Sequence, residues 1–123
     1  MQNILIAGFG GLIGTMMRYL LNNAIYKMLA FPLYPYGTLT INILGCFFIG
    51  LIASLTESRF SFTPELRIFV QIGILGGFTT FSTFGYETFS LIRDGQFLLG
   101  AANILLQVFV GLFAVWLGYY LGQ

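Results

Sequence analysis

The sequence predicts an all-α membrane protein with four transmembrane helices in a single domain over residues 1–123. Of these residues, 58% are hydrophobic and only 7% are charged, whereas soluble domains carry about 25% charged residues. The five basic and four acidic side chains leave uncharged runs at 1–17, 28–56, 68–86 and 95–123. Crossing a hydrocarbon layer about 30 Å thick takes about 20 apolar residues. Each run therefore marks one span of a multi-pass membrane protein.

The composition also excludes several classes of function. The chain has no His and a single Cys, Cys46, which excludes Ser-His-Asp and Cys-His catalysis, metal sites built from His or Cys, and an internal disulfide. The net charge is only +1, and binding to nucleic acid needs clusters of Lys and Arg to neutralise phosphates. We therefore expect neither an enzyme nor a nucleic-acid-binding protein.

The first two spans are expected over residues 3–22 and 38–56. The first is not expected to be a signal peptide, because no basic residue precedes its apolar stretch and no convincing cleavage site follows it. Pro32, Pro35 and Gly37 lie between the two spans. Proline and glycine interrupt helices, so this segment is predicted to be the first loop.

The third and fourth spans are expected over residues 66–92 and 97–121. Thr63 is a candidate N-cap and Pro64 suits the first helical turn, so together they predict where the third helix begins. The residues Arg-Asp-Gly at 93–95 form the tightest predicted turn, between the third and fourth helices.

The loop charges do not favour one orientation in the membrane. Four spans place Arg59 and Arg67 on one face and Lys27 and Arg93 on the other, and orientation normally follows an excess of such residues. Arg18 is not counted because it lies inside the first span. A chain without this bias can insert both ways, which permits an antiparallel homodimer. The alternative is that other features fix one orientation.

The middle of the third span is predicted to be broken between Gly76 and Thr80. Two adjacent glycines, Gly76 and Gly77, each weaken a helix by about 1 kcal/mol relative to Ala. Irregular backbone at membrane depth is tolerated where it is buried in protein or lines a cavity. The first half would end in free carbonyls that suit a cation, and the second half would begin with N–H groups that suit an anion. A kink stabilised by Thr and Ser side chains is the alternative.

Three pairs of glycines have the four-residue spacing that lets helix backbones approach closely in lipid. We expect these pairs mainly to pack the four helices of one bundle together. They are Gly10 with Gly14, Gly73 with Gly77, and Gly118 with Gly122.

Aromatic rings and neutral donors predict a site for a small anion. Phe81 and Phe84 lie three residues apart, and so near one face of the helix that follows the break. The edge of an aromatic ring carries partial positive charge. Thr38 and Asn42, four residues apart in the second span, form a strip of donors. Ring edges alternating with such donors can hold an anion without a formal counter-charge.

Four other polar residues lie within the spans. Arg18 either extends to the interface or lines an aqueous mouth that concentrates anions. Glu87, one turn beyond the rings, either pairs with a cation or serves packing. Asn103 and Gln107, four residues apart in the fourth span, can cross-link helices at about 1 kcal/mol per hydrogen bond. Cross-linking is the preferred interpretation for Gln107.

Two segments carry a resemblance to a known family. Residues 37–42 read Gly-Thr-Leu-Thr-Ile-Asn, and residues 76–84 read Gly-Gly-Phe-Thr-Thr-Phe-Ser-Thr-Phe. This pattern resembles the Fluc family of bacterial fluoride channels, also called CrcB. Arg18 in the first span and Asn103 in the fourth agree, so the resemblance covers essentially the whole chain.

The resemblance implies an antiparallel, dual-topology homodimer in the cell's inner (plasma) membrane, with two fluoride pores and a central structural sodium ion. It implies that Phe81 and Phe84 contact fluoride and that Asn42 forms part of the polar wall. It also implies that backbone carbonyls of Gly76 and Thr79 from both subunits hold the sodium. Residues and resemblance together give these candidate pore residues: Arg18, Thr38, Asn42, Phe81, Ser82, Thr83, Phe84 and Asn103.

The function expected is passive, selective export of fluoride from the cytoplasm, which lowers its toxicity. Neutral HF crosses membranes and dissociates inside, so a path for the ion lets the membrane potential expel it. One alternative is a small four-helix proton-coupled drug exporter, which would need a carboxylate in the first span, where this chain has only Arg18. The other alternative is a non-conducting accessory subunit.

Overall fold

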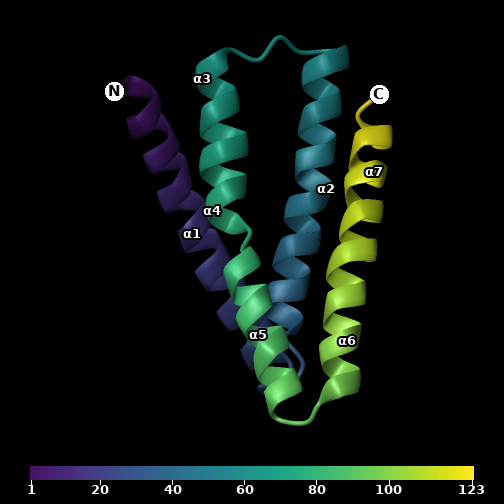
Figure 1. The fold of residues 1–123 in the computed structure, drawn as a ribbon. Helices are drawn as coiled ribbons and strands as arrows, with labels where there is room; N and C mark the ends of the chain where they lie inside the picture. Colours follow the sequence, from purple (N-terminus) through teal and green to yellow (C-terminus); the bar gives the residue numbers. More distant parts are fainter.

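The computed structural model describes residues 1–123 as helices joined by short loops (Figure 1). Four segments are long and apolar enough to cross a membrane: Gln2–Met28, Tyr36–Ser58, Pro64–Arg93 and Phe97–Leu121. The prediction of four spans is therefore confirmed. The elements are α1 (Gln2–Met28), α2 (Tyr36–Ser58), α3 (Pro64–Arg67), the π-helix η1 (Ile68–Leu75), α4 (Gly76–Phe78), α5 (Phe81–Arg93), α6 (Phe97–Leu105), the π-helix η2 (Leu106–Val110) and α7 (Gly111–Leu121).

The first helix runs six residues beyond its predicted end at residue 22. Asn22 and Asn23 do not stop it, since asparagine is only mildly unfavourable within a helix. The chain leaves the helix where Ala30 and Phe31 take φ values of 54° and 55°. The other boundaries follow the predicted signals. Thr63 Oγ1 accepts a hydrogen bond from the Leu66 amide at 3.2 Å, as an N-cap should.

The helices pack as two pairs that separate toward the end carrying both termini (Figure 1). On one side α1 contacts η1 and α4, and on the other α2 contacts α7. Glycines allow the backbone of α1 to approach η1 and α4 closely. A Cβ added to Gly73 would lie 2.7 Å from the Cα of Gly10. A Cβ added to Gly77 would lie 2.6 Å from the carbonyl oxygen of Gly11. The predicted packing role of these glycines is confirmed.

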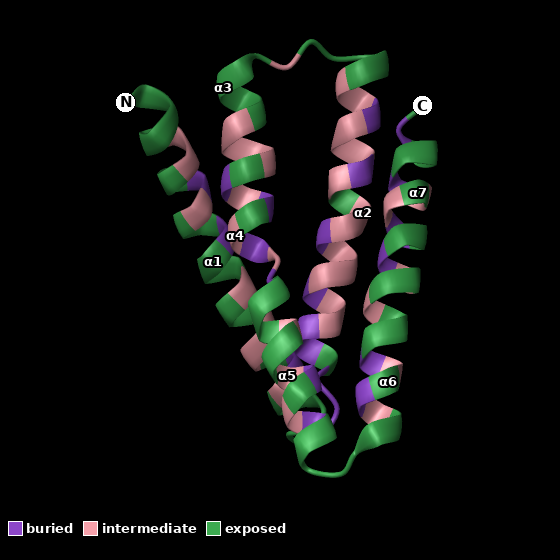
Figure 2. Cartoon of the chain, in the orientation of Figure 1, coloured by how far each residue is buried: buried purple, intermediate pink, exposed green.

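Many large apolar side chains lie on the molecular surface. Only 23 of 123 residues are buried, and large exposed hydrophobic side chains occur on all four spans. Figure 2 shows the exposed residues on the outward sides of α1 and α7. A water-soluble monomer rarely exposes apolar patches of this extent, so these faces suit lipid or a second protein chain. The protein is a multi-pass membrane protein.

Candidate functional site

The third span is interrupted at Thr79 and Thr80. Helix α4 ends at Phe78, and the two threonines adopt extended conformations with φ and ψ of −84° and 160° and of −153° and 116°. The predicted break is therefore confirmed, at the C-terminal edge of the predicted window. Gly76 and Gly77 remain helical, and the missing side chain of Gly77 lets α4 pack closely against α1.

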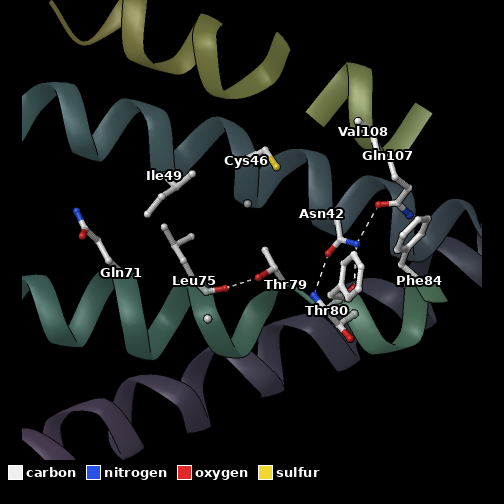
Figure 3. A pocket seen from close by; sticks show the side chains of 13 residues that line it. Asn42, Cys46, Ile49, Gln71, Leu75, Thr79, Thr80, Phe84, Gln107 and Val108 are labelled. Atoms are coloured by element: carbon white, nitrogen blue, oxygen red, sulfur yellow. Dashed lines mark hydrogen bonds between the residues drawn. The ribbon is translucent and has the colours of Figure 1, made fainter. Parts of the chain in front are cut away.

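Asn42 satisfies the backbone that the break exposes. Its Nδ2 donates to the carbonyl oxygen of Thr80 at 3.1 Å, and the Thr80 amide donates to its Oδ1 at 2.9 Å. The same Nδ2 donates to Gln107 Oε1 at 3.0 Å (Figure 3). An asparagine amide has two hydrogens, so both are used. Asn42 thereby joins the second, third and fourth spans at one point.

The second half of the third span begins with helix α5, whose N-terminus is capped by Thr80. Thr80 Oγ1 accepts from the Thr83 amide at 3.3 Å and donates to Thr83 Oγ1 at 2.9 Å. The first amides of a helix have no partner within it, so those of Phe81 and Ser82 remain available. They lie at the positive end of the helix dipole, which favours an anion.

The two predicted rings lie together beside the break. The centroids of Phe81 and Phe84 are 5.5 Å apart and their planes are tilted by 57°. Both line a cavity of about 390 Å³ that also includes Asn42, Gly45, Cys46, Ile49, Gln71, Leu75, Gly76, Thr79, Thr80, Gln107 and Val108 (Figure 3). No lining residue is charged. Phe81 is 82% exposed in the single chain, whereas Phe84 is half-buried.

A second cavity holds most of the other predicted residues. It has a volume of about 370 Å³ and is lined by Thr15, Arg18, Tyr19, Asn22, Thr38, Ile41, Thr80, Ser82 and Thr83. Thr80 lines both cavities. The structure thus brings Arg18, Thr38, Ser82 and Thr83 together on one side of the break, with the rings on the other.

The structure places Gln107 as the sequence analysis preferred, and it gives Glu87 a specific partner. Gln107 cross-links helices through Asn42, as preferred, but its Nε2 is buried without a partner and its side chain lines the ring cavity. Glu87 Oε1 accepts a hydrogen bond from Thr38 Oγ1 at 2.8 Å. That bond directs the Thr38 hydrogen toward Glu87, so the hydroxyl does not act as a free donor.

Asn103 lies outside both cavities. It is 0% exposed and is hydrogen-bonded to Tyr34 and Thr88. Burial raises the pKa of the Tyr34 phenol, and the electrostatic effects of Tyr36 and Glu87 raise it further. The phenol therefore keeps its hydrogen at neutral pH. Nothing in the spacing of Asn103 in the sequence indicates that a residue of the first loop would be its partner.

Comparison with known proteins identifies the family. A family model described as "CrcB-like protein, Camphor Resistance (CrcB)" matches residues 5–119. The chain belongs to the CrcB/FluC family. A protein of Geobacter metallireducens, named fluoride-specific ion channel FluC, is 49% identical over 115 residues, which cover 94% of this chain and 91% of the relative. These CrcB/FluC proteins are channels and not enzymes.

Two further CrcB/FluC relatives match over a similar length. Fluoride-specific ion channel FluC of Geotalea daltonii is 43% identical over 118 residues, 96% of this chain and 94% of the relative. Fluoride-specific ion channel FluC 3 of Methanosarcina barkeri is 46% identical over 118 residues, 96% of this chain and 88% of the relative.

Proposed function

We propose that this protein is a fluoride-selective channel that passively exports fluoride from the cytoplasm. The observation that carries the proposal is the ring cavity at the helix break. There Phe81 and Phe84 lie beside the amides of Asn42 and Gln107, and no charged side chain lines the wall. Membership of a family whose relatives are named fluoride-specific channels supports the same conclusion.

The chemistry of this cavity suits a small, strongly hydrated anion. Removing water from an ion in a low-dielectric path costs tens of kcal/mol if nothing replaces it. The replacements available are the unpartnered Nε2 of Gln107, the first amides of α5 and the edges of the two rings. Neutral donors replace the hydration shell but bind weakly enough for the ion to leave. A fixed positive charge at this depth would hold it.

The proposed assembly is an antiparallel homodimer with two pores. Phe81 is 82% exposed in the single chain although it lies next to a polar wall. A second chain would cover this ring and close the open side of the cavity. The balance of Arg59 and Arg67 against Lys27 and Arg93 supports insertion in both orientations. Arg18, in the second cavity, would attract the anion toward the pore.

A structural sodium ion completes the proposal. The extended backbone at Thr79 ends α4, so its last carbonyls have no helical partner. Gly76 and Thr79 both line the ring cavity, and backbone oxygens at such broken helices suit Na⁺. The backbone oxygens of this chain are therefore suitable ligands for the ion. Two carbonyls are too few for a coordination shell, so the proposal requires the same pair from a second chain. The sodium would hold the two subunits together.

Fluoride efflux from liposomes tests the proposed function. Purified protein in potassium fluoride vesicles, with a potassium ionophore added, should release fluoride rapidly, and vesicles loaded with chloride should retain it. A proton-coupled exporter or an accessory subunit would give no such efflux. Folded protein in the vesicles without fluoride efflux would overturn the proposal.

Dual topology has a separate test. In a Cys46→Ser background, a Gln123→Cys variant should react with a membrane-impermeant maleimide from both sides of the membrane. Labelling from one side only would leave fluoride conduction standing but exclude the antiparallel dimer.

A further inference from the structure

Three hydrogen bonds in succession, two of them buried and the third part-buried, connect Tyr34 to the backbone of Phe84. Tyr34 Oη donates to Asn103 Oδ1 at 3.2 Å, and Asn103 Nδ2 donates to Thr88 Oγ1 at 2.9 Å. Thr88 Oγ1 donates in turn to the carbonyl oxygen of Phe84 at 2.8 Å. This chain of bonds therefore connects the first loop, helix α6 and helix α5, and it ends on the backbone of a residue whose ring lines the proposed pore.

The direction of these bonds is fixed. A hydroxyl has one hydrogen, and Thr88 gives its hydrogen to Phe84, so Thr88 can only accept from Asn103. If the Asn103 amide were turned over, its oxygen would face Thr88, and one of the bonds would be lost. Asn103, Thr88 and Tyr34 are 0%, 7% and 8% exposed, so solvent has little access to replace a missing partner. Only one orientation of the Asn103 amide allows all three hydrogen bonds to form.

Helix α5 needs such a fixed point because the break separates it from the first half of its span. Its N-terminal end is held where Thr80 meets Asn42. Two turns later, Thr88 is held by Asn103 of α6. The helices are close here, since a Cβ added to Gly100 would lie 2.7 Å from Cγ1 of Ile92.

We infer that Asn103, acting through Thr88, is a positioning residue that sets the place of the Phe84 ring in the pore and does not itself contact the ion. The link to permeation rests on the proposed function. The positioning of the ring does not, because it follows from hydrogen bonds within the chain.

The test removes the chain of bonds at two points. Asn103→Leu removes both bonds of the amide with little change in size, and Thr88→Val removes the hydroxyl in an isosteric way. Either change should lower the fluoride conductance of single channels about five- to thirtyfold, the equivalent of one or two buried hydrogen bonds. Thr88→Ser keeps the hydroxyl and should restore most of the conductance.

A matched control separates positioning from general stability. Thr56 Oγ1 in α2 donates to the carbonyl oxygen of Ile52 at 2.6 Å. Like the bond from Thr88 to Phe84, this bond joins a threonine hydroxyl to the carbonyl four residues earlier. Thr56 lines neither cavity. Thr56→Val should leave the conductance of single channels unchanged. Melting temperatures of all variants are measured in parallel.

A spectroscopic readout completes the test. With 4-fluorophenylalanine at position 84, the parent chain should give one narrow ¹⁹F resonance, and Asn103→Leu and Thr88→Val should shift or split it. An unchanged resonance would overturn the positioning role, whatever the melting temperatures. A changed resonance with unchanged conductance would overturn its importance for permeation. If the parent chain conducts no fluoride, the proposed function fails while the resonance still decides whether Asn103 places the ring.

Discussion

Asn42 and Thr80 exchange two hydrogen bonds, from Nδ2 to the Thr80 carbonyl at 3.1 Å and from the Thr80 amide to Oδ1 at 2.9 Å. A side-chain amide of the second span thus replaces the helical partners that the third span lacks at its break. Irregular backbone at membrane depth is tolerated only where it is buried in protein or lines a cavity, and Thr80 is buried and lines both cavities. The two bonds from this asparagine therefore stabilise the interrupted helix.

Removing the Asn42 amide should damage both stability and flux. Asn42→Ala leaves the amide and carbonyl of Thr80 without partners, and each such buried group costs about 1–3 kcal/mol. We expect a lower melting temperature in detergent and little fluoride efflux. Asn3→Ala, an exposed asparagine near the N-terminus, should change neither. A variant of Asn42 with parent stability and flux would contradict the role assigned to this pair.

The ring of Phe81 should matter for transport and little for folding. The side chain is 82% exposed in the chain, so Phe81→Ile removes few contacts within the fold but does remove one polarised ring edge. Fluoride efflux should fall by at least about tenfold, if one ring edge contributes as much as a good aromatic contact of roughly 1.5 kcal/mol. Phe9→Ile, with an exposed ring on α1, is the control. Parent flux through well-folded Phe81→Ile protein would remove the argument from ring edges.

The unpartnered donor of Gln107 should also contribute to transport. Gln107→Leu removes both this donor and the acceptor that Asn42 uses. Losing one neutral hydrogen bond of about 1–1.5 kcal/mol should slow fluoride efflux roughly five- to tenfold. The exposed Gln96, in the turn before α6, provides the control Gln96→Leu. If both variants release fluoride at the parent rate, Gln107 serves only to cross-link helices.

Two glycines of α1 should respond differently to alanine. A Cβ on Gly10 would lie 2.8 Å from the Cα of Gly73, whereas a Cβ on Gly8 would meet nothing within 4 Å. Forcing a methyl group into a packed interface costs about 1–3 kcal/mol, so Gly10→Ala should unfold at a lower temperature. Gly8→Ala should be neutral or slightly stabilising, because alanine favours helix. Equal melting temperatures would argue against close packing of α1 on η1.

The spans were predictable because most of the charged residues lie at or near the loops, with only Arg18 and Glu87 well inside a span. The position of the break was harder to predict. Adjacent glycines suggest a break by their weak helix propensity, but Gly77 is used for contact with Gly11 and stays helical. The burial of Asn103 was not predictable, since its partner Tyr34 belongs to a loop 69 residues away. The roles of the individual pore residues remain predictions for the experiments above.

Both hydrogens of the Asn42 amide are already engaged, by the carbonyl of Thr80 and by Gln107 Oε1. An anion that draws on this amide must therefore compete with an acceptor that belongs to the protein. In the proposed channel, the protein oxygen and the ion would compete for the same hydrogen, and this competition would shorten the residence time of the ion at the amide. Such a wall would bind the anion reversibly, because the internal hydrogen bond re-forms as soon as the ion leaves the amide.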